Sequence, residues 1–226
     1  MNPSVPQAII DQAYADDPAS ASAEYGAQFR ADVESYISRD AIVACVSVNV
    51  RERPPLPNIA YRGFIDPSGG RSDSMTLAIA HRDANMSVID AIREVRPPFS
   101  PESAVGEFAH LLSKYRVNRV QGDRYAGEWP VEQFRKHGIA YEAAPKPKSD
   151  LYRDLLPLVN SKLVDLLDHP KLVNQLASLE RRTARGGRDS VDHAPGAHDD
   201  VANSVSGVVS AIGFGRGDAW LNLIWD

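Results

Sequence analysis

The sequence lacks the features that mark secreted and membrane proteins. Its single cysteine, Cys45, cannot form a disulfide within the chain. No run of about 18 apolar residues could span a bilayer, and the N-terminus lacks the basic and apolar segments of a signal peptide. Cys45 lies in the apolar run 41–46, which is typical of a buried, unreactive thiol. These absences predict a cytoplasmic protein with no membrane partner.

Positive charge is also scarce: 25 lysines and arginines stand against 30 aspartates and glutamates, a net charge of -5. This balance argues against a protein that binds nucleic acid over a broadly basic surface. Local contacts with nucleic acid are still possible, because metal ions offset the charge of carboxylates and because basic residues can be concentrated in one segment. The sequence also lacks the phosphate-binding pattern Gly-x-x-x-x-Gly-Lys followed by Ser or Thr, so ATP-driven work cannot be ascribed to it.

The length of 226 residues and the hydrophobic content of 43% suffice for one substantial domain with an extension. The proline-rich segment 51–57 suits a linker, because proline continues neither a helix nor a central strand. Before it, apolar residues at three- and four-residue steps predict a helix over residues 20–37. We expect an N-terminal helical extension and linker over residues 1–57 and a main domain over residues 58–226.

The main domain is predicted to be α/β, with a mixed five-stranded sheet. The expected strands are 59–66, 74–81, 86–95, 119–122 and 139–142, and helices are expected over 100–115 and 128–137. Helical crossovers make the strands that they join parallel, so helices should cover both faces of the sheet.

The last third of the chain predicts three more helices and a hairpin. Helices are expected over 149–160, 170–179 and 198–212, whereas residues 163–167 fit either a helix or a strand. A Gly-Gly pair at the centre of residues 180–189 predicts a C-terminal, arginine-rich β-hairpin.

Carboxylates end two of the predicted strands and open the last helix. Asp66 precedes a Pro-Ser-Gly-Gly turn, Asp123 follows the strand 119–122, and an Asp-Asp pair begins the helix 198–212. If the first and fourth strands are neighbours, about 4.8 Å apart, Asp66 and Asp123 lie together at a rim where open α/β sheets bind ligands. Taken singly, each segment is also explained by an ordinary turn or by the helix dipole.

Three carboxylates at one rim suit two Mg²⁺ or Mn²⁺ ions, which can promote phosphodiester hydrolysis. We therefore expect Asp66, Asp123 and Asp200 to be catalytic metal ligands. Successive helical residues differ by about 100° in direction, and the apolar stripe of the last helix places Asp200 near the rim and Asp199 away from the core. Asp199 is expected to be an outer or water-mediated partner, and His198 is a further candidate ligand.

Basic residues that suit phosphate contacts occur in the hairpin and after the fifth strand. The candidate DNA-binding residues are Arg181, Arg182, Arg185, Arg188, Lys146 and Lys148. The alternative is a solvated hairpin without a ligand. Trp129 and Trp220 are expected in cores or interfaces rather than stacked on bases.

Four segments, in order, resemble the nuclease domain of the large terminase subunit, the DNA-packaging motor of tailed double-stranded DNA bacteriophages. The segments are 64–70, 122–129, 179–188 and 198–203. The similarity covers about residues 58–213, and the stretch 20–57 resembles the part that joins motor to nuclease in that family.

The resemblance implies an RNase H-like fold and a metal-dependent endonuclease that cuts double-stranded DNA during viral genome packaging. It places the metal-binding acids on Asp66, Asp123 and Asp200, with Mg²⁺ or Mn²⁺ as cofactor. The implied partners are DNA, the portal protein, the small terminase subunit and a packaging ATPase domain, within a bacterial host cell. Full large terminases carry an ATPase, for which this sequence has no phosphate-binding loop.

Two other functions are open from the sequence. His198 and Asp199 also fit an HD-type metal phosphohydrolase, but such enzymes are nearly all-helical, and the strand-rich region 59–142 disfavours them. A non-catalytic RNase H-like module could dock on DNA or on the portal without cutting. The three intact aspartates count against this second alternative.

Overall fold

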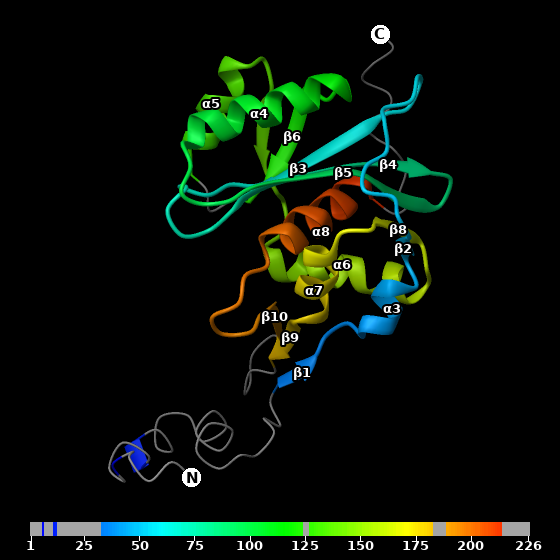
Figure 1. The fold of residues 1–226 in the computed structure, drawn as a ribbon, viewed down its shortest axis with the longest axis vertical. Coiled ribbons are helices and arrows are strands. Elements are labelled where there is room, and N and C mark those ends of the chain that lie inside the picture. The colour runs from blue at the N-terminus through cyan, green and yellow to red at the C-terminus, as the bar shows by residue number, and fades with distance from the viewer. Residues whose placement is uncertain (1–5, 7–10, 13–32, 124–126, 183–188, 214–226) are drawn as a thin grey trace.

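The computed structural model describes residues 6, 11–12, 33–123, 127–182 and 189–213. Its centre is a seven-stranded sheet with the strand order β2-β8-β5-β4-β3-β6-β7 (Figure 1). In that order the strands are Val46–Ser47, Val164–Leu167, Met86–Val95, Met75–Asp83, Tyr61–Asp66, Arg119–Gly122 and Ala140–Ala143. The three middle strands are antiparallel, and the two strands added on each side are parallel to their inner neighbours. The sheet is therefore mixed, as predicted.

Helices cover both faces of this sheet, which the crossover order also predicts. On one face lie α4 (Pro101–Lys114) and α5 (Trp129–Lys136), and on the other lie α6 (Lys148–Asn160), α7 (Pro170–Ala177) and α8 (Asp200–Ile212) (Figure 1). Successive side chains of β3 point to opposite faces, so Phe64 and Ile65 belong to two different buried clusters. The sheet thus separates two hydrophobic cores.

The helix α8 is buried on all sides, because it lies between the sheet and helices α6 and α7. Every residue from Asp200 to Val209 is buried. Gly207 faces Phe64 of β3, and a Cβ atom at Gly207 would lie 2.4 Å from the Phe64 ring. Glycine at this position therefore allows α8 to approach β3 closely.

All five predicted strands are present, and two further strands widen the sheet. The ambiguous segment 163–167 is the strand β8, which is largely buried and pairs with β5 in parallel. The second addition is β2, only two residues long, which pairs with β8 at the sheet edge. The five-stranded prediction is therefore too small by these two parallel strands.

The hairpin is confirmed by its two strands, β9 (Leu179–Arg182) and β10 (Ser190–His193), which pair antiparallel. Residues 183–188 lie outside the described part of the chain. A third strand, β1 (Val33–Ser35), pairs with β9, so the helix predicted over residues 20–37 is wrong at its end. Residues 20–32 are not described.

Residues before the proline-rich linker contribute to the larger core. The short helix α3 (Arg39–Val43) buries Ile42, and Cys45 is buried with its Sγ 3.4 Å from the Val159 carbonyl oxygen. Both side chains belong to the same cluster as Phe64. The division of the chain at residue 57 stays a prediction about domains. None of the described helices is long and apolar enough to cross a membrane.

Candidate metal centre

The strand register brings the ends of β3 and β6 together. Ile65 pairs with Gly122 in parallel register, so Asp66 and Asp123 follow at the same rim of the sheet. A Cβ atom at Gly122 would lie 2.1 Å from the Tyr141 hydroxyl and 2.7 Å from the Ile65 carbonyl oxygen. Glycine before Asp123 is therefore required for the close approach of β6 to β3 and β7. From the sequence, Asp66 and Asp123 could be placed together only on the condition that these two strands are neighbours, and the structure meets that condition.

The start of α8 is fixed to the same rim by backbone contacts. Thr76 on β4 pairs with Asp66 in the sheet and donates its hydroxyl to the Asp200 carbonyl oxygen at 2.7 Å. The Asn203 amide N–H donates to the Asp199 carbonyl oxygen at 2.7 Å. These contacts hold the first turn of α8 beside the ends of β3 and β4.

A cavity of about 470 Å³ opens between these elements. Its carboxylate lining consists of Asp66, Asp73, Asp123, Asp199 and Asp200. The structure thus brings the three predicted catalytic aspartates into one cavity, together with Asp199 and His198. Asp73, in the loop between β3 and β4, is an acid of this cavity that the sequence did not single out.

Asp66 is the carboxylate whose environment is most unusual. Burial raises its pKa to about 8, a hydrogen bond from the Asn203 side chain opposes the rise, and the charges of the neighbouring aspartates add to it. The buried Oδ1 atom of Asn203 has no hydrogen-bond partner among the described residues. Crowded carboxylates beside an orphaned amide oxygen are the donor set that a hard divalent cation prefers.

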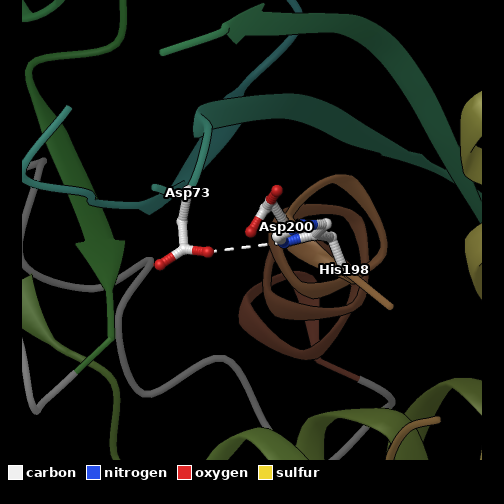
Figure 2. Close-up of side chains that lie close together, drawn as sticks. All are labelled: Asp73, His198 and Asp200. Carbon is white, nitrogen blue, oxygen red and sulfur yellow. Dashed lines mark ion pairs between the residues drawn. The ribbon is translucent and has the colours of Figure 1, made fainter. Parts of the chain in front are cut away.

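One cluster within the cavity surrounds Asp200. Figure 2 shows Asp73, His198 and Asp200 side by side, and one ligand atom from each lies within 4.8 Å of the others. His198 Nδ1 lies 3.4 Å from Asp73 Oδ1, whereas no lysine or arginine of the described chain pairs with Asp73 or Asp200. Burial raises the pKa of Asp200, although the nearby Lys171 and His198 oppose the rise. This cluster carries excess negative charge.

A second cluster surrounds Asp199 and includes Asp192 and His193 of β10. Lys148 Nζ lies 2.7 Å from an Asp192 oxygen and 3.0 Å from an Asp199 oxygen. Tyr152, one turn later on α6, donates its hydroxyl to Asp199 Oδ2 at 2.7 Å. The carboxylate of Asp199 therefore already has a cation and a hydrogen-bond donor.

The prediction that Asp199 points away from the core is wrong. Asp199 is only 6% exposed and contacts the buried Tyr152 hydroxyl. It is the N-cap residue of α8, with φ of -133° and ψ of 17°, so its side-chain direction does not follow the helical phase. Helix periodicity places side chains only from the first residue with helical dihedral angles onward.

The predicted DNA-binding residues are mostly held by partners within the chain. Lys146 pairs with Asp154 at 2.7 Å, Arg181 Nε donates to Asp189 at 2.9 Å, and Arg182 donates to the His193 carbonyl oxygen at 2.9 Å. Lys148 lines the acidic cavity between its two aspartates. Arg185 and Arg188 lie outside the described residues. DNA contact by these six residues stays a prediction.

No protein-family model matches the sequence, and no curated protein does. Solved structures do match. The large terminase nuclease of thermophilic phage G20c with bound magnesium gives a TM-score of 0.66 at 16% identity, over 78% of this chain and 98% of that one. The large terminase nuclease domain of Thermus phage P74-26 gives 0.65 at 15% identity, over 80% and 98%. The G20c nuclease was also crystallised with cobalt and with zinc.

The HK97 bacteriophage large terminase gives a TM-score of 0.60 at 15% identity, and the match covers 92% of this chain but 50% of that protein. The chain thus spans about half the length of that full terminase. At these identities the likeness is one of fold, and the chain has the RNase H-like fold of tailed-phage large terminase nuclease domains.

Proposed function

We propose that this protein is a divalent-metal-dependent endonuclease that cuts double-stranded DNA during phage genome packaging. The proposal is carried by one observation: Asp66, Asp123 and Asp200, from three separate elements, line one cavity at the rim of this fold. The G20c terminase nuclease, which has the same fold, was crystallised with divalent metals, which supports a metal-dependent reaction.

The residues of the cavity fit such a metal. Asp66, Asp123 and Asp200 would hold two Mg²⁺ or Mn²⁺ ions, with Asp73 and His198 within reach of the ion beside Asp200. When bound, the ions supply an activated water and stabilise the leaving oxygen of the phosphodiester. We assign Asp199 an outer position, because Lys148 and Tyr152 both contact its Oδ2 atom.

The protein's own residues set the geometry of this site. The Asn203 side chain orients Asp66 through its hydrogen bond, and Thr76 fixes the start of α8 through the Asp200 carbonyl oxygen. Burial raises the pKa of Tyr141, so its hydroxyl stays protonated and donates to the Asp123 carbonyl oxygen at 3.4 Å. Each proposed ligand is thus anchored by a neighbour that is itself packed in a core.

DNA would be held on the rim of the cavity by phosphate contacts. We assign these contacts to Arg181, Arg182, Arg185, Arg188, Lys146 and Lys148, with Lys148 able to serve only from within the cavity. Contacts to phosphates carry no base readout and would give binding that weakens with salt. The portal protein, the small terminase subunit and a packaging ATPase domain are the partners that the large-terminase fold suggests.

The test uses supercoiled plasmid with Mg²⁺, Mn²⁺ or EDTA, and compares the wild-type protein with Asp66→Asn. Nicking is expected with either metal and absent with EDTA or in the variant, while both proteins keep the same circular dichroism spectrum. Metal should also raise the melting temperature of the wild type, because an ion that binds only the folded state stabilises it. Equal cutting by Asp66→Asn would contradict the proposed mechanism. Binding of plasmid without any cutting would instead support a docking module.

A further inference from the structure

A second hollow, of about 390 Å³, lies beside the acidic cavity. Its lining is Pro67, Ser68, Gly69, Pro101, Trp129 and Pro130. Pro67, Ser68 and Gly69 line both hollows, so the loop after β3 is a wall between them. A molecule bound at the acids can therefore reach the second hollow by crossing this loop.

The chemistry of the second hollow differs from that of the first. Three prolines and one tryptophan make most of its lining, and none of its described lining residues is charged. Trp129 is 37% exposed, which is high for so large an apolar side chain, and it belongs to neither buried cluster, so the prediction of a core position is wrong. Acids lie in the first turns of both bordering helices, Glu102 on α4 and Glu132 on α5. This surface suits a flat, uncharged ring and disfavours a phosphate.

The wall of this hollow is held in one conformation. Gly70 has φ of +78°, and a Cβ atom there would lie 2.5 Å from the Phe99 carbonyl oxygen. The Phe99 N–H donates to the Gly70 carbonyl oxygen at 3.3 Å, and the Ser68 hydroxyl donates to the Asp73 carbonyl oxygen at 2.6 Å. The hollow is therefore formed before any ligand binds, so little ordering of the loop opposes binding.

We propose that the Trp129 hollow binds a nucleobase of the strand being cut, unstacked from its neighbours, beside the phosphate at the acidic cavity. This inference rests on the proposed nuclease function. A base within a paired stack exposes only its edges, so its face reaches an indole ring only after the base has left the stack. Double-stranded DNA would then fray at the cleavage position, so a duplex with an unpaired nucleotide there should bind more tightly than a perfectly paired one.

Tryptophan fluorescence gives a direct test, because the chain has three tryptophans, Trp129, Trp220 and Trp225. Replacing Trp220 and Trp225 by phenylalanine leaves Trp129 as the reporter. The Asp66→Asn change and Mg²⁺ are added so that DNA binds without being cut. Quenching of Trp129 emission is expected with a single-stranded oligonucleotide and with a duplex that carries one unpaired nucleotide. A fully paired duplex should bind with little quenching.

Affinity measurements complete the test. In the otherwise unchanged protein, Trp129→Ala should weaken binding of the unpaired substrates about tenfold, since base–aromatic stacking has a large, sequence-tolerant effect. Trp129→Phe should retain most of the affinity. Val131→Ala is the matched control, because Val131 is an exposed apolar residue of the same helix, 41% exposed, outside the hollow.

The outcomes separate this inference from the nuclease proposal. Plasmid nicking with unquenched Trp129, and wild-type affinity in Trp129→Ala, would overturn the nucleobase site and leave the nuclease intact. Equal quenching by fully paired duplex would overturn the requirement for an unstacked base. Loss of both nicking and DNA binding in the wild-type protein would instead remove the nuclease proposal, and this inference with it.

Discussion

Asp199 and Asp200 are consecutive residues with nearly equal burial, 6% and 8% exposed, but a lysine pairs with the cluster of Asp199 and none in the described chain pairs with that of Asp200. Around Asp199, Lys148 pairs with two carboxylates and Tyr152 donates a hydrogen bond. Around Asp200 the neighbours are Asp73 and His198, with no lysine or arginine pair in the described chain. The negative charge of the Asp199 cluster is thus partly compensated within the protein, whereas that of the Asp200 cluster is not.

The difference shows how one helix start can serve structure and chemistry together. Burial alone would lower the pKa of Lys148, but the hydrogen bonds and charges of Asp192 and Asp199 raise it overall, so the ammonium persists. A buried carboxylate that keeps a partner contributes to the fold, whereas one without a partner destabilises the fold until a cation arrives. We therefore interpret the Asp199 cluster as a support and the Asp200 cluster as the part of the site open to metal.

The largest difference between the two clusters is expected when each of the two neighbouring aspartates is substituted. Asp200→Asn should lower plasmid cleavage by more than about a hundredfold, because it removes a proposed ligand. Asp199→Asn should leave a measurable fraction, in the 10- to 100-fold range of losses typical of groups that support metal ligands. Initial cleavage rates in Mn²⁺ measure both. An inactive Asp199→Asn protein together with an active Asp200→Asn protein would show that Asp199, and not Asp200, is the metal ligand.

The same two variants should move metal-free stability in opposite directions. Asp200→Asn relieves repulsion in an uncompensated cluster and should raise the melting temperature in EDTA. Asp199→Asn leaves Lys148 without one of its two anions and should lower it. Changes of the same sign in both variants would contradict the distinction between the clusters.

Lys148 tests the supporting cluster from its cationic side. Lys148→Met keeps the length of the side chain but leaves Asp192 and Asp199 without their cation. Because these ion pairs are partly exposed, we expect the free energy of unfolding to fall by about 2 kcal/mol, a value between those of exposed and buried ion pairs. This loss lowers the melting temperature by roughly 4–8 °C. Thermal melts in EDTA measure it, with Lys148→Arg as the charge-conserving control. A Lys148→Met protein as stable as wild type would show that this cluster is not a support.

The dependence of stability on pH sharpens the description of the uncompensated side. Burial raises the pKa of Asp66 from 3.8 to about 8 and also raises that of Asp200. Between pH 3.8 and about pH 8, the native state binds more protons than the unfolded chain. The free energy of unfolding therefore falls as pH rises. The metal-free protein should melt at a lower temperature at pH 8 than at pH 5. The dependence on pH should be shallower in Asp66→Asn, and an unchanged or steeper dependence in that variant would exclude Asp66 as its source.

The strands β3 to β7 could be predicted because apolar runs and turns are local patterns, and the crossover helices between them indicate a mixed sheet. The sequence leaves open which strands are neighbours and in what register, so the pairing of β3 with β6 that brings Asp66 and Asp123 together was only a condition of the prediction. The edge strand β2 has two residues and forms only by pairing with β8, so no sequence period reveals it. The start of β1, within a predicted helix, shows tertiary pairing with β9 overriding helical periodicity.

The sequence singled out most of the acids that line the cavity, but not the side chains that contact them. Lys148 and Tyr152 are four residues apart on α6, and Asp200 and Asn203 three apart on α8, so each pair shares a helix face. That spacing was available in the sequence, but which face meets which carboxylate depends on helix packing. Asp73 lies in a loop, where no hydrophobic periodicity indicates the direction of a side chain. The N-cap conformation of Asp199 could not be anticipated, because helix boundaries are uncertain by one or two residues.

The position of α8 in the core also has a consequence for when the site can first exist. Asp200 meets Thr76 across 124 residues of chain, and the Phe64 face of the sheet is covered by α8. The ribosome adds about 5–20 residues per second, so roughly 6–25 seconds separate the synthesis of Thr76 from that of Asp200. Throughout that interval the nascent strands carry Asp66 without its partner acids on α8, with one face of the sheet uncovered. The proposed metal site therefore cannot form until the last core helix has been made.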